Sequence, residues 1–272
     1  MEIVSLVVPV YNEADRWNRG YWVDLLSLDS VHWIFVDDGS SDTTSEKLRD
    51  LPHSLKHEIL RLSGNRGKGE AIRAGFLFFF GSDSDGQALG ALRAGTVRSK
   101  LVGFLDADAA FSKEDISRIL SVASGKILRD PSRSFPAESV IYNSVWASRV
   151  AMSGRKIIRT PSRHYLGRIV STLLSPFVPS MPYDSQCGFK IFEASDEFKD
   201  AIATPFKTRW FFDLEILIKW GKTNGSRLKI WEEPLDSWTD IPGSHLSAKN
   251  VFGIVGEIIK IIRDSRGSNR GS

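Results

Sequence analysis

Two aspartates that follow a short apolar run are the residues of this chain best placed to do chemistry. Asp106 and Asp108 come directly after residues 102–105, which have the composition of a buried strand. Residues i and i+2 of an extended chain point the same way, so the two carboxylates face one side. Such a pair can hold a divalent cation, which can bridge a diphosphate. Because an isolated Asp-x-Asp pair is about as often a solvated turn, the prediction depends on the motifs around it.

Three further polar motifs stand where a strand is expected to end or a helix to begin. They are Tyr11-Asn12-Glu13, Asp37-Asp38-Gly39-Ser40 and Asn65-Arg66-Gly67-Lys68-Gly69. Carboxylates after a strand can accept hydrogen bonds from a nucleobase or a ribose, and a glycine loop with two cations that opens a helix suits a phosphate. Each motif alone is also compatible with a turn or a helix cap, so only their combination indicates a nucleotide site.

The second half of the chain adds further charged residues. Lys190 offers a point charge for a phosphate, whereas Cys187 is expected to be a small buried residue, because no histidine lies near it in sequence. Asp213 and Glu215 begin a predicted helix over 212–220. Since they are two residues apart, they point in different directions on that helix, and at most one is expected to face the site. Acids are also favoured at a helix N-terminus by the helix dipole alone.

Alternating strands and helices are predicted to position these motifs. Strands are predicted at 3–9, 32–36, 58–62, 101–105 and 139–147, and helices at 17–28, 43–51 and 68–80. Such alternation implies a mainly parallel α/β sheet. Ligands bind beyond the carboxyl ends of the strands in sheets of this kind, which is where the polar motifs lie.

The composition is that of an ordinary globular protein. Of the 272 residues, 42% are hydrophobic and 25% are charged, and the net charge of +3 is too small to argue for nucleic acid as a partner. The single cysteine excludes an internal disulfide and fits a reducing compartment. The N-terminus runs straight into a strand-like segment, and no apolar stretch approaches the ~18 residues that span a bilayer. We therefore expect neither a signal peptide nor a transmembrane helix.

Taken together, the motifs resemble those of the inverting glycosyltransferases of family 2, and most of all the dolichyl-phosphate glucosyltransferases and their bacterial polyprenyl-phosphate relatives. The residues that carry the resemblance are 9–13, 36–42, 65–69, 106–108, 147–149, 184–190, 209–215 and the Trp-x-x-Ile-x-Gly-Ser pattern at 238–244. The order and spacing of these motifs make the resemblance specific.

The resemblance implies a fold and a domain organisation. The expected fold is GT-A, an α/β architecture with a Rossmann-like, mostly parallel central sheet flanked by helices and with amphipathic helices near the C-terminus. We expect a single domain over 1–264, with a nucleotide-sugar-binding half at 1–111 and an acceptor-binding half at 112–264. Residues 265–272 have the composition of a disordered tail.

The resemblance also implies roles for individual residues. Those expected to line the nucleoside are Pro9, Tyr11, Glu13, Asp37 and Asp38, with Lys68 near the base or the diphosphate. Asp106 and Asp108 are expected to carry Mg²⁺ or Mn²⁺. The residues expected at the acceptor phosphate are Arg149, Arg163, Lys190 and His245. Asp108, Asp213 and Glu215 are the expected catalytic carboxylates.

The reaction that the resemblance implies is transfer of a hexose, preferably glucose from UDP-glucose, to a polyprenyl or dolichyl phosphate with inversion. A phosphate monoester is already largely anionic at neutral pH, so no strong base is needed; with a hydroxyl acceptor, Asp213 or Glu215 becomes the base candidate. Four alternatives stay open. They are a GDP-mannose donor, a soluble enzyme with a hydroxyl acceptor, a phosphatase of the haloacid dehalogenase type with Asp106 as nucleophile, and a nucleotide-sugar-binding protein without turnover.

Three features depart from the family pattern. Ala110 stands where related mannosyltransferases often have a glutamine beside the metal, and His245 stands where a lysine is expected near the acceptor. A histidine is charged only part of the time near neutral pH, so acceptor binding is expected to weaken or to depend on pH. Residues 82–98 are polar and glycine-rich and form a longer connection than the family pattern predicts.

Two basic amphipathic segments are candidates for membrane contact. Apolar pairs recur at helical spacing over 165–178 and over 251–262, with arginine or lysine beside them. Basic amphipathic helices lie in anionic bilayer surfaces, although packing on a protein core is the more common fate of such a helix. We favour membrane contact for the first segment and leave both outcomes open for the second. The expected location is cytoplasmic, peripheral on the cytoplasmic face of a membrane.

Overall fold

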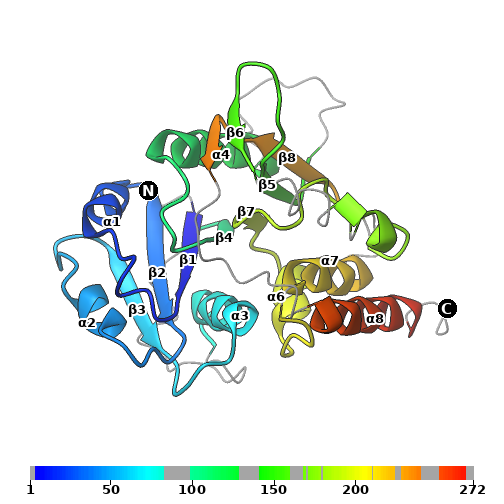
Figure 1. The fold of residues 1–272 in the computed structure, drawn as a ribbon, viewed down its shortest axis with the longest axis horizontal. Helices are drawn as coiled ribbons and strands as arrows, with labels where there is room; N and C mark the ends of the chain where they lie inside the picture. The colour runs from blue at the N-terminus through cyan, green and yellow to red at the C-terminus, as the bar shows by residue number, and fades with distance from the viewer. Residues whose placement is uncertain are drawn as a thin grey trace.

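A seven-stranded sheet forms the centre of the molecule (Figure 1). The computed structural model describes residues 4–82, 99–128, 141–159, 168–169, 171–178, 180–209, 211–223, 228–239 and 251–267. In spatial order the strands are β3 (His57–Arg61), β2 (Val31–Asp37), β1 (Val4–Val10), β4 (Leu101–Leu105), β7 (Phe189–Glu193), β5 (Ser144–Ser148) and β8 (Ile230–Pro234). A separate parallel pair joins β6 (Lys156–Ile158) to β9 (Ser237–Thr239).

Most strand pairs are parallel, as the alternation of elements predicts. β1 pairs in parallel with β2 and with β4, β2 with β3, and β5 with β8. β7 is the exception, because it runs antiparallel to both of its neighbours, β4 and β5. The carboxyl ends of β1, β2 and β4 therefore meet at one edge of the sheet, and the beginning of β7 meets them there.

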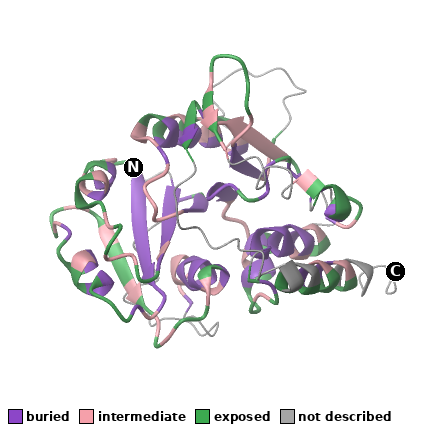
Figure 2. Cartoon of the chain, viewed as in Figure 1, coloured by how far each residue is buried: buried purple, intermediate pink, exposed green. Residues whose placement is uncertain are grey.

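Helices cover both faces of the sheet. One buried cluster contains side chains of α1 (Arg19–Leu26), α2 (Thr44–Arg49) and α4 (Lys113–Ile127), and the other contains those of α3 (Lys68–Phe79), α6 (Asp196–Ile202), α7 (Phe212–Thr223) and α8 (Val251–Gly267). Alternation along β1 sends Leu6 and Val8 to the first cluster and Val7 to the second. Because both faces are covered, β1, β2 and β4 are buried along almost their whole length (Figure 2).

Pro9 lies inside β1, whereas the strand predicted over 3–9 ends at this residue. It pairs with Val36 of β2. On the other side of β1, the pairing with β4 ends at Val7 and Phe104. At Pro9 the strand therefore has only one neighbour, which is the edge-like position that a residue without a backbone N–H tolerates.

Two predicted features fall wholly or partly outside the described residues. Of the insertion predicted over 82–98, only Ser82 is described. Helix α8 runs to Gly267, so the first three residues of the predicted tail are helical, and 268–272 lie outside the described residues.

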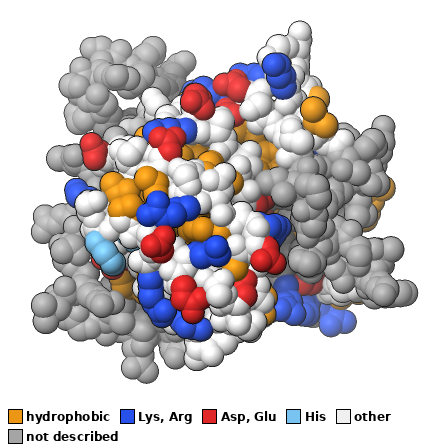
Figure 3. All heavy atoms as spheres, turned by 60° about the vertical axis from the view of Figure 1, so that its left-hand side comes forward, with side chains coloured by type: hydrophobic (Ala, Val, Ile, Leu, Met, Phe, Trp, Pro, Cys, Tyr) orange, Lys and Arg blue, Asp and Glu red, His pale blue; other side chains and the backbone are white. Residues whose placement is uncertain are grey.

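The face over α1, α2 and β3 carries acidic and basic side chains that are interspersed (Figure 3). One ion pair on this face joins Arg19 of α1 to Asp50 at 2.9 Å, and another joins Asp24 of α1 to Lys113 of α4 at 2.6 Å. The described part of this face therefore mixes both signs of charge.

Candidate active site

Asp106 lies at the sheet edge, between the start of α3 and the start of β7. Its carboxylate is 2.6 Å from Lys68 Nζ through Oδ1 and accepts a hydrogen bond from the same ammonium through Oδ2 at 2.8 Å. Its backbone N–H donates to Gly188 O at 2.9 Å. A Cβ added to Gly188 would overlap the carboxylate of Asp106, so the absence of a side chain at Gly188 is what lets β7 approach this aspartate.

Asp108 is half-buried, and its carboxylate accepts a hydrogen bond from Ala110 N at 3.2 Å. Burial raises its pKa to about 6, and the negative charges of Asp106 and Glu13 push it in the same direction. A cation bound between the two aspartates would offset both effects.

The donor set fits a hard divalent cation only in part. Among the described residues, no group of three or more histidine, cysteine, aspartate or glutamate side chains could hold a metal ion. Ala110 packs against the apolar cluster and supplies no ligand atom from its side chain. Two carboxylates suffice for a cation such as Mg²⁺, which keeps several water ligands and takes phosphate oxygens from its substrate. The residues present therefore fit a metal that is shared with a diphosphate.

Asp37 and Asp38 follow each other at the end of β2 and hold different loops. Asp37 is buried and accepts hydrogen bonds from Ser40 N at 2.8 Å and from Ser45 Oγ. Asp38 accepts hydrogen bonds from the backbone N–H groups of Arg66 and Gly67, each at 2.8 Å. Both carboxylates thus shape the edge of the sheet, and their direct contact with a nucleoside stays a prediction.

The loop after β1 completes this edge. Tyr11 is 43% exposed, which leaves its ring available for stacking. Glu13 pairs with Arg16 at 2.5 Å, and burial raises its pKa despite that pair. The edge of the sheet that carries Asp106 and Asp108 therefore also carries the residues predicted to line the nucleotide, as a nucleotide site would require. They are Pro9, Tyr11, Glu13, Asp37, Asp38 and Lys68.

Arg149, predicted to meet an acceptor phosphate, directs its guanidinium at a carboxylate of the protein. Its Nε and Nη2 donate to the two oxygens of Asp184 at 2.8 and 2.7 Å, and its backbone N–H donates to the same group at 2.8 Å. Burial opposes ionisation of Asp184, but the hydrogen bonds and charge of Arg149 prevail and lower the pKa to about 2. The ring of Trp238 lies 5.2 Å from the guanidinium carbon. A phosphate that binds Arg149 would therefore share the guanidinium with the carboxylate of Asp184.

Lys190 and Asp213 form a buried ion pair between β7 and α7. Both side chains are almost fully buried, and Lys190 Nζ also donates to Ser185 O at 2.6 Å and lies 4.2 Å from the ring centroid of Trp146. Lys190 is therefore enclosed among protein groups. A role of Lys190 in a phosphate pocket stays a prediction, and so does a catalytic role of Asp213.

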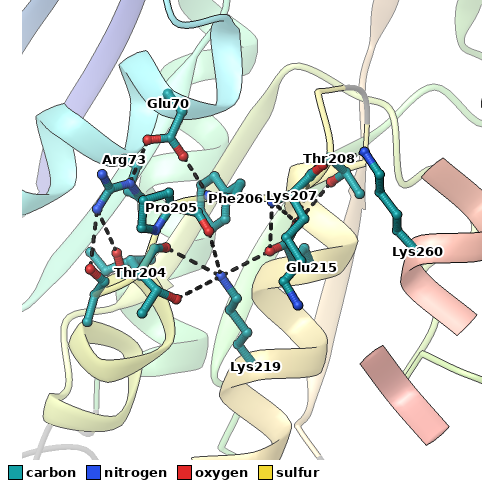
Figure 4. Close-up of polar contacts among 12 residues, drawn as sticks. Glu70, Arg73, Thr204, Pro205, Phe206, Lys207, Thr208, Glu215, Lys219 and Lys260 are labelled. Atoms are coloured by element: carbon teal, nitrogen blue, oxygen red, sulfur yellow. Dashed lines mark hydrogen bonds and ion pairs between the residues drawn. The ribbon is translucent and has the colours of Figure 1, made fainter. Parts of the chain in front are cut away.

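Glu215 points away from Asp213, as their spacing on a helix predicts. Its carboxylate accepts the backbone N–H groups of Lys207 and Thr208 at 2.9 and 3.1 Å and pairs with Lys219 at 3.0 Å (Figure 4). These contacts hold the segment before α7. They give no support to a catalytic role for Glu215, which stays a prediction.

Of three other residues singled out in the sequence, one lies in the core and two are outside the described part of the chain. Cys187 is buried, and burial raises the pKa of its thiol to about 12, so it is the small core residue that was expected. Arg163 and His245 lie outside the described residues.

Comparison with known proteins shows that the chain is similar in sequence to glycosyltransferases. Residues 5–126 match the family described as "Glycosyl transferase family 2". Residues 5–126 form a family 2 glycosyltransferase domain. The protein is therefore an enzyme, and specifically a glycosyltransferase, as the motifs predicted.

Relatives extend the similarity beyond this domain. The chain is 29% identical to the dolichyl-phosphate beta-glucosyltransferase of Saccharomyces cerevisiae, over 90% of this chain and 69% of that protein. It is 28% identical to the Homo sapiens protein of the same name, over 89% of this chain and 69% of that one.

A solved structure confirms the GT-A fold. Glucosyl-3-phosphoglycerate synthase from Mycobacterium tuberculosis, in complex with Mn²⁺, UDP-glucose and phosphoglyceric acid, has a TM-score of 0.61 to this chain at 15% identity. The match covers 98% of this chain and 80% of that one. At this level of identity the likeness concerns the fold alone.

The predicted membrane segments divide their apolar residues between surface and core. In the first, Ile169 and Leu173 are 58% and 57% exposed, whereas Leu174 and Val178 are buried. In α8, Ile261 is buried in the core cluster that contains α7. No helix in the described ranges combines the length and the apolar character needed to cross a membrane.

Two residues that shape the site have contacts that could not be predicted from the sequence. Gly188 belongs to the motif over 184–190, but its close approach to Asp106 depends on the pairing of β4 with β7, which was not predicted. Arg209 was quoted as part of a motif without a role, although it lies beside the glycine loop that Asp38 holds.

Proposed function

We propose that this glycosyltransferase transfers glucose from UDP-glucose to a polyprenyl or dolichyl phosphate, with inversion at the sugar carbon. The observation that carries the proposal is the pair Asp106 and Asp108 at the end of β4, beside Lys68 at the start of α3. Similarity to dolichyl-phosphate beta-glucosyltransferases over about nine-tenths of the chain supports glucose as the sugar and a lipid phosphate as the acceptor.

Asp106 and Asp108 would hold Mg²⁺ or Mn²⁺ together with oxygens of the donor diphosphate. A divalent cation at this place supplies charge that stabilises the departing nucleoside diphosphate. Lys68 adds a fixed positive charge on the same side, and Asp37 and Asp38 hold the loops that would surround the nucleoside. The Mn²⁺ and UDP-glucose bound by the structurally similar synthase are consistent with this assignment.

The acceptor phosphate would enter from the side of β5 and β7. We propose Arg149 and Arg163 as its cations, with Lys190 and His245 as further residues of the pocket. Because the phosphate is already anionic, the attacking oxygen needs no strong general base. Asp213 or Glu215 would matter as a base only for a hydroxyl acceptor, and the contacts of both carboxylates with protein groups favour the phosphate.

The lipid chain of the acceptor requires contact with a membrane surface. We propose that the exposed side chains Ile169 and Leu173 make this contact, with Arg168 beside them, on the cytoplasmic face. Arginine next to exposed apolar residues suits an anionic bilayer.

A transfer assay with several donors and acceptors tests the proposal. UDP-glucose or GDP-mannose, each with a radiolabelled sugar, would be incubated with dolichyl phosphate, undecaprenyl phosphate or phosphoglyceric acid, with Mn²⁺ or with EDTA. We expect label from UDP-glucose to enter the lipid phase only when metal is present. Transfer of label from GDP-mannose would identify GDP-mannose as the donor in place of UDP-glucose. Label in phosphoglyceric acid would identify that compound as the acceptor in place of a lipid phosphate. Trapping of a phospho-enzyme would favour the phosphatase alternative.

A further inference from the structure

Arg209 places a guanidinium against the glycine loop at the edge of the sheet. A Cβ added to Gly67 would lie 3.5 Å from Arg209 Nε and 3.7 Å from Nη2, so the guanidinium covers the side of Gly67 where a side chain would stand. Gly67 has a φ of 95° and directly precedes Lys68, the first residue of α3. Arg209 thus reaches from the segment before α7 to the start of α3.

The backbone over 206–209 is held by three helices, and Figure 4 shows the contacts of Phe206 and Lys207 with Glu70 and Glu215. Glu70 of α3 accepts the N–H of Phe206 at 2.6 Å, and Glu215 of α7 accepts that of Lys207 at 2.9 Å. Glu257 of α8 accepts the N–H of Arg209 itself at 2.8 Å. Because these bonds fix the backbone, binding of a ligand at the guanidinium would not require the backbone there to be ordered.

Arg209 is exposed, and its charge acts on Asp38 through space and not through a hydrogen bond between the two side chains. In the part of the chain that the structure describes, its guanidinium makes no hydrogen bond and no ion pair. Burial raises the pKa of Asp38, and the hydrogen bonds from Arg66 and Gly67, together with the charge of Arg209, oppose that rise. Both oxygens of Asp38 already accept those N–H groups, so Arg209 keeps its donors for another acceptor.

Two cationic side chains, Lys68 and Arg209, lie at the start of α3. Lys68 is neutralised by Asp106 at 2.6 Å, whereas Arg209 has no such partner among the described residues. The N–H groups at the beginning of a helix add to the attraction for an anion. An arginine fork matches phosphate oxygens in geometry as well as in charge.

We propose that Arg209 binds the diphosphate of the nucleotide donor, which makes it a donor-binding residue in addition to those inferred from the motifs. The inference rests on the proposed function. In the transfer, an acceptor oxygen forms a bond to the sugar C1 while the bond from C1 to the diphosphate oxygen breaks. The electron pair stays on that oxygen, and Arg209 stabilises the resulting charge.

Calorimetric titration of Arg209→Gln and Arg209→Lys with UDP and with uridine, in the presence of Mn²⁺, tests the inference. We expect Arg209→Gln to weaken UDP binding by about tenfold or more, the range of one charge-assisted contact, and to leave uridine binding unchanged. Arg209→Lys keeps the charge but loses the fork, so its affinity for UDP should lie between those of the wild type and the glutamine variant. Arg19→Gln, which removes an exposed arginine paired with Asp50, is the matched control and should bind UDP normally.

Two results would overturn the role of Arg209 alone. One is unchanged UDP affinity in Arg209→Gln, and the other is an equal loss for uridine and UDP, which would place the contact at the nucleoside. Misfolding is checked by thermal melting, which should not change because the side chain of Arg209 has no hydrogen bond to lose among the described residues. Absence of UDP binding by the wild type would overturn the proposed function itself, and that result is distinct from the other two.

Discussion

Asp106 and Asp108 are two residues apart but differ in what surrounds them. Asp106 has the ammonium of Lys68 as a close partner, whereas among the described residues the carboxylate of Asp108 accepts only the N–H of Ala110. Burial and the charge of Asp106 both make ionisation of Asp108 unfavourable. A group whose charge is penalised in the free protein gains most when a cation binds, so Asp108 is the better position at which to test the metal site.

Replacement of Asp108 by asparagine should remove metal-dependent donor binding without unfolding the protein. Affinity for UDP-glucose in the presence of Mn²⁺ should fall by about tenfold to hundredfold, because one charge-assisted contact is lost. The melting temperature should not fall, since the amide avoids burying a charge. Calorimetry and thermal melting measure both effects, with Asp24→Asn as a control at an exposed ion pair. Full Mn²⁺-dependent affinity in Asp108→Asn would contradict the metal assignment.

The pair of Arg149 with Asp184 should make stability depend on pH. The pKa of Asp184 is about 2 in the folded protein, below its ordinary value of 3.8. The ionised group therefore stabilises the fold above a pH of about 4, and this contribution of about 2–3 kcal/mol is lost as the pH falls towards 2. The free energy of unfolding of the wild type should exceed that of Asp184→Asn at pH 5, and the difference should shrink by pH 2. If the difference in unfolding free energy between the two proteins did not change with pH, the lowered pKa of Asp184 would be refuted.

At the scale of elements, the first half of the fold could be predicted from the sequence and much of the second half could not. The runs that form β1, β2 and β4 are almost wholly apolar, and turn residues follow each of them, so both their existence and their ends were visible. Parallel order then brought Asp38 and Asp106 to one edge. In contrast, the reversal of β7 depends on a long-range pairing with β4 that no local pattern encodes.

The contacts of charged side chains were the least predictable part of the site. Lys190 was assigned to a phosphate because of its charge, and Arg149 because of the family resemblance. Their carboxylate partners, Asp213 and Asp184, lie 23 and 35 residues away along the chain. Only the tertiary fold brings these pairs together. The direction of Glu215 could be predicted relative to Asp213, because helical geometry alone determines it.

The buried pair of Lys190 and Asp213 should be essential to the packing of β7 against α7. Lys190→Met leaves the carboxylate of Asp213 buried without its partner and should lower the free energy of unfolding by about 3–5 kcal/mol. The double variant with Asp213→Leu removes both charges and should recover most of that loss. Urea denaturation measures both variants. If the double variant were as unstable as Lys190→Met, the loss would come from packing and not from an unpaired charge.

At the scale of the whole molecule, the exposed residues Ile169 and Leu173 are the proposed contact with the membrane that would hold a lipid acceptor. Replacing both with serine should reduce sedimentation with anionic liposomes by several-fold, because exposed apolar area and nearby basic charge together drive binding to such surfaces. Folding should be unaffected, whereas a serine at the buried Leu174 would disturb the core. Ile59→Ser, at an exposed apolar residue of β3, is the matched control. Unchanged sedimentation of the double variant would place the membrane contact elsewhere.

The anomeric configuration of the product tests the central claim most directly, since it reports the donor, the acceptor and the stereochemistry together. UDP-glucose carries an α-linked sugar, so inverting transfer at the site of Asp106 and Asp108 must give a β-linked glucosyl phosphate on the lipid. Purified enzyme would be incubated with UDP-glucose, dolichyl phosphate and Mn²⁺, and the lipid product examined by proton and phosphorus NMR. The account predicts a β-glucosyl phosphodiester whose formation is abolished by Asp108→Asn. An α-linked product, or glucose attached to a hydroxyl with the lipid phosphate unchanged, would contradict it.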